Sequence, residues 1–157
     1  MANLAAGQVF SKALLDMRLS TTRGDVTLRD FLGHGLVVYF YPKDDTPGCT
    51  VEGKDFSAKH QAFLAADTQV IGVSRDSLAS HQKFIAKHGL TITLVSDADE
   101  RLCQAFGVIK EKNMYGKKVM GIERSTFLID AQGVLRQSWR GVKVPGHVEE
   151  VLAAAKR

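Results

Sequence analysis

The sequence predicts an α/β domain of three layers, in which helices cover both sides of a mixed central sheet. Two segments, Leu36–Tyr41 and Gln69–Ser74, are continuous apolar runs, as expected for strands buried on both faces. Helical segments alternate with these runs, which favours parallel pairing through right-handed crossovers. A hairpin signature and a last helix follow, so we expect the sheet to have an antiparallel edge.

The first part of the chain predicts an N-terminal hairpin. Its expected strands are Asp16–Leu19 and Val26–Leu28, on either side of the turn sequence at residues 22–25. A short helix over Leu28–Leu32 should follow, and Gly33 should end it.

The longest expected helix extends from Pro47 to about Ala65, with Phe56, Phe63 and Leu64 on its core side. A second helix and a short strand follow it, and a third helix has an aspartate at its beginning. These elements are expected at Leu78–His88, ended by Gly89; at Thr93–Ser96; and at Arg101–Phe106, capped by Asp97 or Asp99 and ended by Gly107.

The last part of the chain predicts a second hairpin and a closing helix. Ser125–Ile129 and Val134–Trp139 flank residues 130–133, whose composition is typical of a hairpin turn. The closing helix is expected from about His147 to Ala155.

The bulk composition suits one domain over residues 1–157. A hydrophobic content of 45% is enough for a real core, and two cysteines are too few for a disulfide framework. The first ten residues lack the basic and apolar segments of a signal peptide, and no apolar stretch approaches membrane-spanning length. We therefore expect a cytoplasmic protein that does not act on membranes.

Positive charge is concentrated in the last third of the chain. Residues 1–100 carry 10 basic and 12 acidic groups, whereas residues 101–157 carry 11 basic and 5 acidic groups. Four lysines cluster in what the sequence predicts to be a loop: Lys110, Lys112, Lys117 and Lys118. No nucleic-acid-binding motif or interleaved aromatic residue accompanies them, so a solvated basic loop is favoured over a nucleic-acid site.

Cys49 is the candidate reactive residue. Thr46 is suited to cap a helix, and Pro47 is suited to its first position, so Cys49 should lie in the first turn near unpaired N–H groups. A cysteine reacts as its thiolate, and an ordinary thiol is only about 3% ionised at pH 7. The positive end of the helix dipole would favour the thiolate. The alternative is a buried cysteine that acts as a small hydrophobe, but turn-forming residues precede this one.

The run from Tyr39 to Glu52, YFYPKDDTPGCTVE, contains the pattern P-x-x-x-T-x-x-C, formed by Pro42, Thr46 and Cys49. This pattern resembles the active-site signature of the peroxiredoxins. The later runs LVSD and IERSTFLID are similar to the bacterioferritin comigratory protein (peroxiredoxin Q) subfamily, and the resemblance extends from about Gly7 to the end of the chain. It implies a thioredoxin-like three-layer α/β/α fold and reduction of hydroperoxides.

The resemblance also implies site roles. Cys49 would attack a peroxide oxygen and become a sulfenic acid, while Thr46 and Arg124 stabilise the reacting oxygens and Pro42 shields the thiolate from water. Thr46 has the alternative of only capping the helix, and Arg124 that of pairing with Glu123 or another carboxylate. Glu52 either pairs with an arginine near the site or only favours the first helical turn, and it is left outside the predicted site. No organic cofactor or metal is expected, because the five histidines lack ligand spacing and are expected to be exposed.

The chain departs from many relatives in lacking their second cysteine. The resemblance places that resolving residue at the positions of Lys54 or Ile85 here, and neither side chain forms a disulfide. The remaining thiol, Cys103, lies next to Leu102, which with Phe106 should face the core, so we expect Cys103 to be buried and inert.

We therefore expect a one-cysteine peroxidase that acts on hydrogen peroxide and organic hydroperoxides. An external thiol (thioredoxin, glutaredoxin or glutathione) would recycle it, and the subfamily suggests a monomer. A two-cysteine mechanism through Cys49 and Cys103 and a non-enzymatic peroxide sensor are the alternatives. A dithiol oxidoreductase is disfavoured, because Thr46 stands where the first cysteine of C-x-x-C would be.

Overall fold

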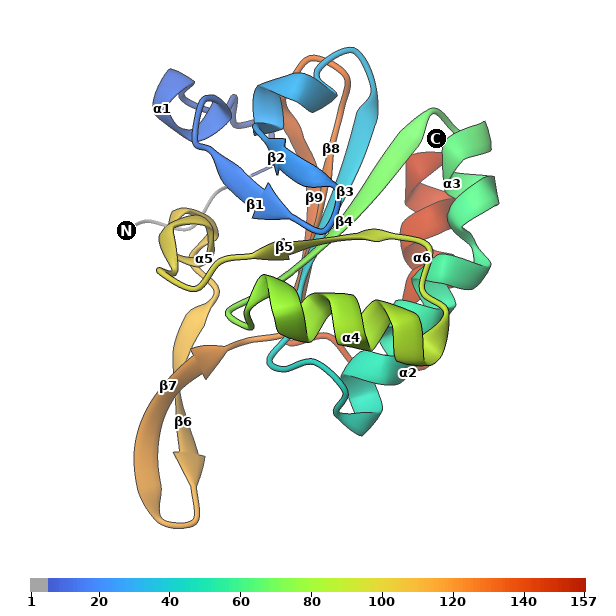
Figure 1. Ribbon diagram of the computed structural model, residues 1–157. Coiled ribbons are helices and arrows are strands. Elements are labelled where there is room, and N and C mark those ends of the chain that lie inside the picture. Colours follow the sequence, from blue (N-terminus) through green and yellow to red (C-terminus); the bar gives the residue numbers. More distant parts are fainter. Residues whose placement is uncertain (1–5) are drawn as a thin grey trace.

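The computed structural model describes residues 6–157, so the first five residues of the predicted domain lie outside the described part (Figure 1). Within that part, seven strands form one sheet in the order β2-β1-β5-β4-β3-β8-β9. The bounds of these strands are β1 Leu19–Thr21, β2 Gly24–Val26, β3 Gly35–Phe40, β4 Thr68–Ser74, β5 Thr93–Ser96, β8 Ser125–Ile129 and β9 Leu135–Arg140. The pairs β3–β4 and β4–β5 are parallel and the others antiparallel, which confirms the mixed sheet.

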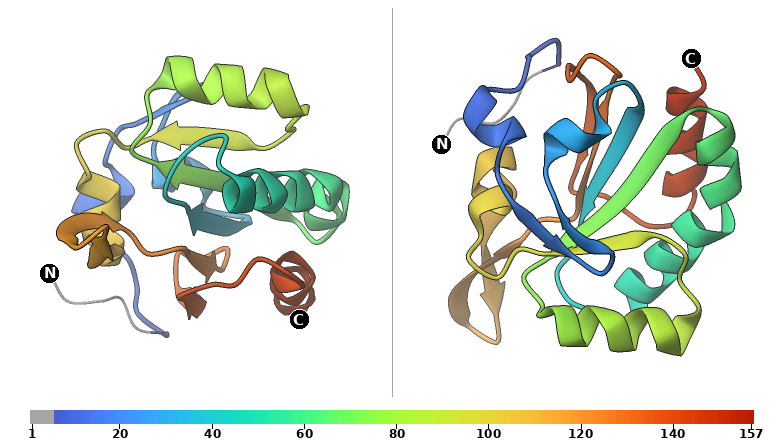
Figure 2. Two further views of the ribbon diagram at one scale, coloured as in Figure 1. Left: turned by 90° about the horizontal axis from the view of Figure 1, so that it is seen from below. Right: turned by 45° about the horizontal axis from the view of Figure 1, so that its top comes forward.

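Helices cover both faces of the sheet, as predicted. They are α1 Lys12–Leu15, the 3₁₀ helix η1 Leu28–Phe31, α2 Pro47–Ala58, α3 His60–Ala65, α4 Leu78–His88, α5 Arg101–Phe106 and α6 His147–Ala155. Both views in Figure 2 place α1 and α5 on the opposite side of the sheet from α2, α3 and α6. The fold is therefore the expected three-layer, thioredoxin-like arrangement.

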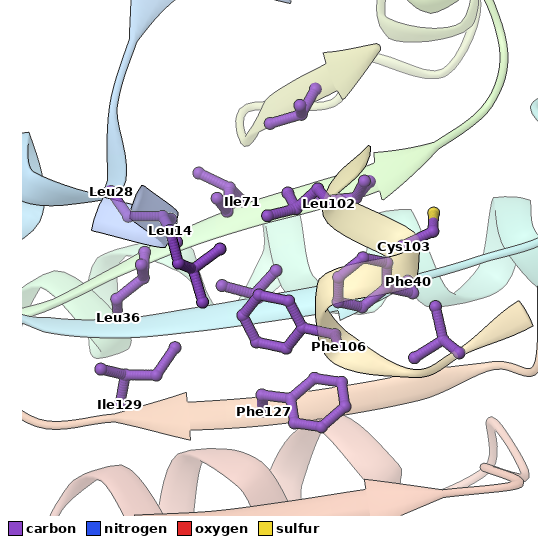
Figure 3. Packing of buried hydrophobic residues seen from close by; sticks show 14 of the residues in the cluster. Leu14, Leu28, Leu36, Phe40, Ile71, Leu102, Cys103, Phe106, Phe127 and Ile129 are labelled. Atoms are coloured by element: carbon purple, nitrogen blue, oxygen red, sulfur yellow. The ribbon is translucent and has the colours of Figure 1, made fainter. Parts of the chain in front are cut away.

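The strand β3 divides the core into two clusters, because alternate side chains of a strand point to opposite faces. Val38 and Phe40 pack with residues of α1, η1 and α5 in the first cluster, which Figure 3 shows. Val37 and Tyr39 belong to the second cluster, with residues of α2, α3, α4 and α6. Cys103 lies in the first cluster and Cys49 in the second, so the two cysteines pack against opposite faces of the sheet.

Several predicted elements need correction at their ends. The first hairpin is confirmed, but both of its strands are shifted. The strand β1 begins at Leu19, since Asp16 follows the unpredicted helix α1 and donates its N–H to the carbonyl of Lys12. The strand β2 ends at Val26, since Leu28 already begins η1. The predicted helix from Pro47 to Ala65 is interrupted at Lys59, which ends α2 and precedes α3. Leu64 is 37% exposed and not in the core, because it lies a further 100° around α3 from the buried Phe63.

The segment that carries the four lysines is a β-hairpin, and the prediction of a loop is wrong. Its strands are β6 (Ile109–Met114) and β7 (Lys117–Ile122), paired antiparallel over six residue pairs. The connection has two central residues with positive φ, Tyr115 at 54° and Gly116 at 79°, as in a type I′ turn. The low strand propensity of lysine hid this hairpin from sequence patterning.

Among the described residues, none of the helices combines the length and the apolar character needed to cross a bilayer.

Candidate active site

Cys49 is the third residue of α2, at the junction that follows β3. Thr46 occupies the N-cap position with an extended backbone (φ −90°, ψ 156°), and Pro47 is the first helical residue. The first backbone bond of the helix runs from the Thr50 N–H to the Thr46 carbonyl at 2.9 Å. Only 2% of Cys49 is exposed. Its thiol therefore lies in a largely water-excluded position at the positive end of α2.

Thr46 does not cap α2 with its side chain, which corrects that prediction. Its Oγ1 donates to the carbonyl of Lys43 at 2.9 Å, and it accepts no cap hydrogen bond from the described residues. Because the hydroxyl proton is used in this way, the oxygen lone pairs are oriented to accept from another donor.

Arg124 contacts the cysteine. Its Nη2 donates to Cys49 Sγ at 3.4 Å, and its Nη1 donates to Glu52 Oε1 at 2.6 Å. The contact arises from the sheet, because β8 begins at Ser125 and pairs with the last residue of β3, Phe40. The groups that meet this guanidinium are the Cys49 sulfur and the Glu52 carboxyl. The predicted alternative of an ion pair with a carboxylate is therefore formed, through Glu52 and not through Glu123, among the described contacts. Burial alone would lower the pKa of Arg124, but Glu52 and Cys49 raise it above its ordinary value.

Gly48 makes room for this approach. A Cβ at this position would lie 3.2 Å from Arg124 Nη2, so a larger residue would press on the guanidinium. Pro42 follows β3 and the buried Tyr41, and it is partly exposed. Its role as a shield for the thiolate stays a prediction.

Sequence reasoning left Glu52 out, although it is part of the site. Its side chain is fully buried, and its second carboxylate oxygen, Oε2, has no hydrogen-bond partner among the described residues. Burial raises the pKa of Glu52 to about 7, against the opposing effect of Arg124. The spacing of three residues from Cys49 was the available signal, since it places both side chains on one face of a helix.

Glu52 should make the stability of the fold depend on pH. The Glu52 carboxyl loses its proton near pH 4.5 in the unfolded chain, but keeps it up to about pH 7 in the folded chain. Its contribution to the free energy of unfolding is therefore full below pH 4.5 and is lost as the pH rises through 7. Between pH 4.5 and 8, the free energy of unfolding of the wild type should fall by up to about 3 kcal/mol relative to that of Glu52→Gln. This figure follows from about 1.4 kcal/mol for each unit by which the pKa is raised. Urea unfolding of both proteins at pH 5 and pH 8 measures this difference. Glu111→Gln, on the exposed hairpin, is the matched control, and an equal pH effect in that variant would contradict the assignment.

A buried polar network holds the loop between β3 and α2. Asp44 accepts hydrogen bonds from Tyr41 Oη at 2.6 Å, Ser80 Oγ at 2.8 Å and His81 Nδ1 at 2.7 Å. His81 Nε2 meets the carbonyl oxygen of Val95 at 2.9 Å. Both ring nitrogens of His81 therefore face hydrogen-bond acceptors. The network joins α4 to the loop that sets the beginning of α2.

The expectation that all the histidines are exposed is wrong, because His81 and His147 are buried. His147 Nε2 lies 2.8 Å from the hydroxyl of Thr126 on β8. Asp44, Asp76 and His81 bring one ligand atom each within 4.8 Å of one another. However, Asp76 Oδ2 accepts from Ser74 Oγ at 2.6 Å and from the Asp44 N–H at 2.9 Å, so hydrogen bonds within the network already use these atoms.

Cys103 is fully buried, as predicted, among the apolar side chains that Figure 3 shows. Asp97 accepts from the N–H groups of Leu102 and Cys103 at 3.0 and 2.7 Å, and Asp99 accepts from that of Arg101 at 3.3 Å. Both predicted aspartates thus satisfy N–H groups at the beginning of α5, although the N-cap position itself is Glu100. Burial and the neighbouring Asp97 raise the pKa of the Cys103 thiol far above its usual range. This thiol is a poor nucleophile in the folded chain.

Known proteins are similar to this chain in sequence and in structure. Residues 10–138 match the model of the AhpC/TSA family. The chain is 59% identical to Peroxiredoxin Bcp of Xanthomonas campestris over 145 residues, which cover 92% of this chain and 91% of the relative. It is 49% identical to Peroxiredoxin Bcp of Bacillus subtilis, with 90% of each chain covered. The chain belongs to the peroxiredoxins of the AhpC/TSA family.

Solved structures agree with the sequence relatives. Peroxiredoxin Q of Xanthomonas campestris superposes with a TM-score of 0.91 at 56% identity, over 96% of both chains. A second structure, of the bacterioferritin comigratory protein from the same organism, is described in terms of its alkyl peroxide reduction activity; it has 56% identity, a TM-score of 0.91 and coverage of 97% and 98%. This peroxiredoxin is accordingly a thiol-dependent peroxidase of the Bcp, or peroxiredoxin Q, group.

Proposed function

We propose that Cys49 is the peroxidatic residue and that the enzyme works with this cysteine alone. The Cys49 thiolate attacks one oxygen of a hydroperoxide, the O–O bond breaks, and water or an alcohol leaves. Cys49 becomes a sulfenic acid, which an external thiol then reduces. Hydrogen peroxide and organic hydroperoxides are the proposed substrates, and the alkyl peroxide reduction reported for the Xanthomonas relative supports the second class.

The observation that carries this proposal is the contact of 3.4 Å between Arg124 Nη2 and Cys49 Sγ. A fixed guanidinium beside the sulfur stabilises the thiolate before the reaction and the charge on the departing oxygen during it. Glu52 holds the guanidinium from its other side at 2.6 Å, so its orientation is set before substrate arrives. The lone pairs of the Thr46 hydroxyl are available to accept the peroxide O–H, and the N–H groups of the first turn of α2 add further donors.

The one-cysteine mechanism is supported by what surrounds Cys49. Lys54 is exposed on α2 and Ile85 is half-buried on α4, so neither position supplies a resolving thiol. Cys103 packs in the other core cluster, across the sheet from Cys49. The alternative disulfide between Cys49 and Cys103 would require α5 to leave its cap and its core contacts.

Replacement of Cys103 should leave catalysis intact. We expect Cys103→Ala to turn over hydrogen peroxide with dithiothreitol at a rate within about twofold of the wild type, because a small apolar residue fits the same core site. A coupled peroxide-consumption assay measures this. Cys49→Ser is the matched variant and should lose turnover completely; loss of turnover in Cys103→Ala despite a folded chain would contradict the one-cysteine mechanism.

The same assay separates an enzyme from a peroxide sensor. An enzyme consumes many equivalents of peroxide for each Cys49, whereas a sensor without recycling stops after one.

Four expectations stay predictions: a protein reductant of the thioredoxin or glutaredoxin type, glutathione as a reductant, a monomeric state and a cytoplasmic location. Gel filtration with light scattering tests the monomer.

A further inference from the structure

The hairpin β6–β7 extends from the body of the protein at the same end as the beginning of α2, in Figure 1 and in the right-hand view of Figure 2. Its strands each have six residues, so the ribbon reaches about 20 Å. Tyr115 at its tip is fully exposed, and Met114 and Met120 are each more than half exposed. The hairpin belongs to neither core cluster beyond its base, where Ile109 and Ile122 pack.

The register divides the hairpin into two different faces. Residues directly opposite one another share a face, and the faces alternate along each strand. One face carries Lys110, Lys112 and Lys117, opposite Gly121, Val119 and Met114 respectively, and we call it the lysine face. Glu111, the sole acid in residues 109–122, lies on the other face, where Lys118 approaches it at 3.8 Å. The lysine face therefore has three positive charges and no carboxylate of its own.

The lysine face leads to the reactive cysteine. The stem of Lys112 crosses Gly121, where a Cβ would meet its Cδ at 3.3 Å, and its ammonium donates to the carbonyl of Ile122. That carbonyl is two residues before Arg124. Lys112 lies within electrostatic range of Arg124, Arg75 and Cys49, and burial first and then these two arginines lower its pKa. Lys112, Arg124 and Arg75 thus place positive charge between the hairpin and Cys49, with the Glu123 carboxylate within the same range.

The shape of this surface selects among possible ligands. Small substrates bind in concave pockets, but the lysine face is an exposed ribbon. Exposed methionine and valine beside lysine suit a protein surface that is partly apolar and rich in carboxylates. We propose that the lysine face is the docking surface for an acidic protein dithiol that reduces oxidised Cys49. This inference rests on the proposed recycling by an external thiol and adds the partner's charge and its place of contact.

The chemistry of recycling balances with a dithiol partner. One partner thiolate attacks the sulfur of the Cys49 sulfenic acid, a mixed disulfide forms, and hydroxide leaves and takes up a proton to become water. The second partner thiol then attacks the partner's own sulfur in that disulfide, which releases the Cys49 thiolate. The partner loses two electrons as its dithiol becomes a disulfide, and Cys49 gains them.

Charge reversal on the lysine face tests the docking surface. The variant Lys110→Glu/Lys117→Glu brings the net charge of +4 to zero, and so does the control Lys12→Glu/Lys156→Glu, whose two lysines lie on α1 and beyond α6. The probes are an acidic thioredoxin and dithiothreitol, at about 10 mM ionic strength, where screening is weak. We expect kcat/KM for the thioredoxin to fall at least about tenfold in the first variant and less than about threefold in the control. The rates of Cys49 oxidation and of recycling by dithiothreitol should stay within twofold.

Neighbouring residues test the assignment of the face. Lys117→Glu should lower kcat/KM for the thioredoxin more than Lys118→Glu, because Lys118 lies on the face that carries Glu111. An unchanged kcat/KM in the lysine-face variant, or an equal loss in the Lys12→Glu/Lys156→Glu control, would overturn the proposal. So would lysine-dependent binding to anionic vesicles or single-stranded DNA without any change in thioredoxin kinetics. Failure of dithiothreitol to recycle the wild type would instead contradict the one-cysteine function, and the docking surface with it.

Discussion

Arg124→Gln should lower the second-order rate constant for oxidation of Cys49 by hydrogen peroxide at least about 100-fold, since loss of one aligned donor from such a site costs about 100- to 1,000-fold. In the wild type, Nη2 lies 3.4 Å from the sulfur and carries a charge that glutamine lacks. The measurement is stopped-flow fluorescence of the reduced enzyme mixed with peroxide, which reports the chemical step without the reductant.

The variant Arg124→Gln should also be less stable than the wild type. Glu52 is fully buried, and Arg124 is its ion-pair partner at 2.6 Å. Without Arg124, the buried Glu52 side chain loses its hydrogen-bond partner, which costs stability, so the double variant Glu52→Gln/Arg124→Gln is needed. We expect the double variant to recover stability while its oxidation rate stays low. If both the stability and the rate return together, Arg124 acts through the fold and not on the peroxide.

Asp44→Asn should destabilise the protein by about 3–5 kcal/mol, the largest effect on stability that we expect outside the apolar core. Asp44 is 6% exposed and accepts from Tyr41, Ser80 and His81. The amide of asparagine offers one acceptor oxygen in place of two, so buried donors lose their partner. Urea unfolding at pH 7 measures the loss.

Asp45→Asn is the matched control for this prediction. Asp45 is the next residue, and its ion pairs with Lys87 and His88 are partly exposed, so the change should destabilise the protein far less than Asp44→Asn does. Asparagine also tolerates the positive φ of 60° at this position. Similar losses in both variants would contradict the role assigned to the buried network.

The stabilisation that the Asp44 network provides should also depend on pH. Burial alone would raise the pKa of Asp44, but the hydrogen bonds from His81, Tyr41 and Ser80 and the charge of His81 lower it below the usual 3.8. The stabilisation is therefore present above pH 3.8 and is lost as the pH falls through the folded value. The difference in the free energy of unfolding between the wild type and Asp44→Asn should therefore become smaller in acid. A difference that widens below pH 3.8 would contradict this sign.

Sequence patterning and the family resemblance predicted most of the fold and the centre of the site. The strands β5 and β8 and the helices α4, α5 and α6 begin and end where apolar periodicity, glycine and turn residues place them. The resemblance named Cys49 and Arg124, which lie 75 positions apart and make contact because β3 pairs with β8.

Two of the errors have a common physical origin, which is that long-range contacts decide them. Asp44 looks like a turn residue, yet it is buried because His81, 37 positions later, supplies its partner. Glu52 has no local signature of a functional residue and becomes one through Arg124. Lysines have a low intrinsic preference for strands, but the two-residue turn at Tyr115 and Gly116 closes their segment into a hairpin.

In the one-cysteine mechanism only Cys49 is oxidised by peroxide, and one mass measurement tests this. The reduced protein is treated with one equivalent of hydrogen peroxide in the presence of a sulfenic-acid trap, and its intact mass is recorded. We predict a single trap adduct that maps to Cys49 and is absent from Cys49→Ser. A loss of about 2 Da without an adduct would mean that Cys49 and Cys103 form a disulfide, and the one-cysteine mechanism would be wrong.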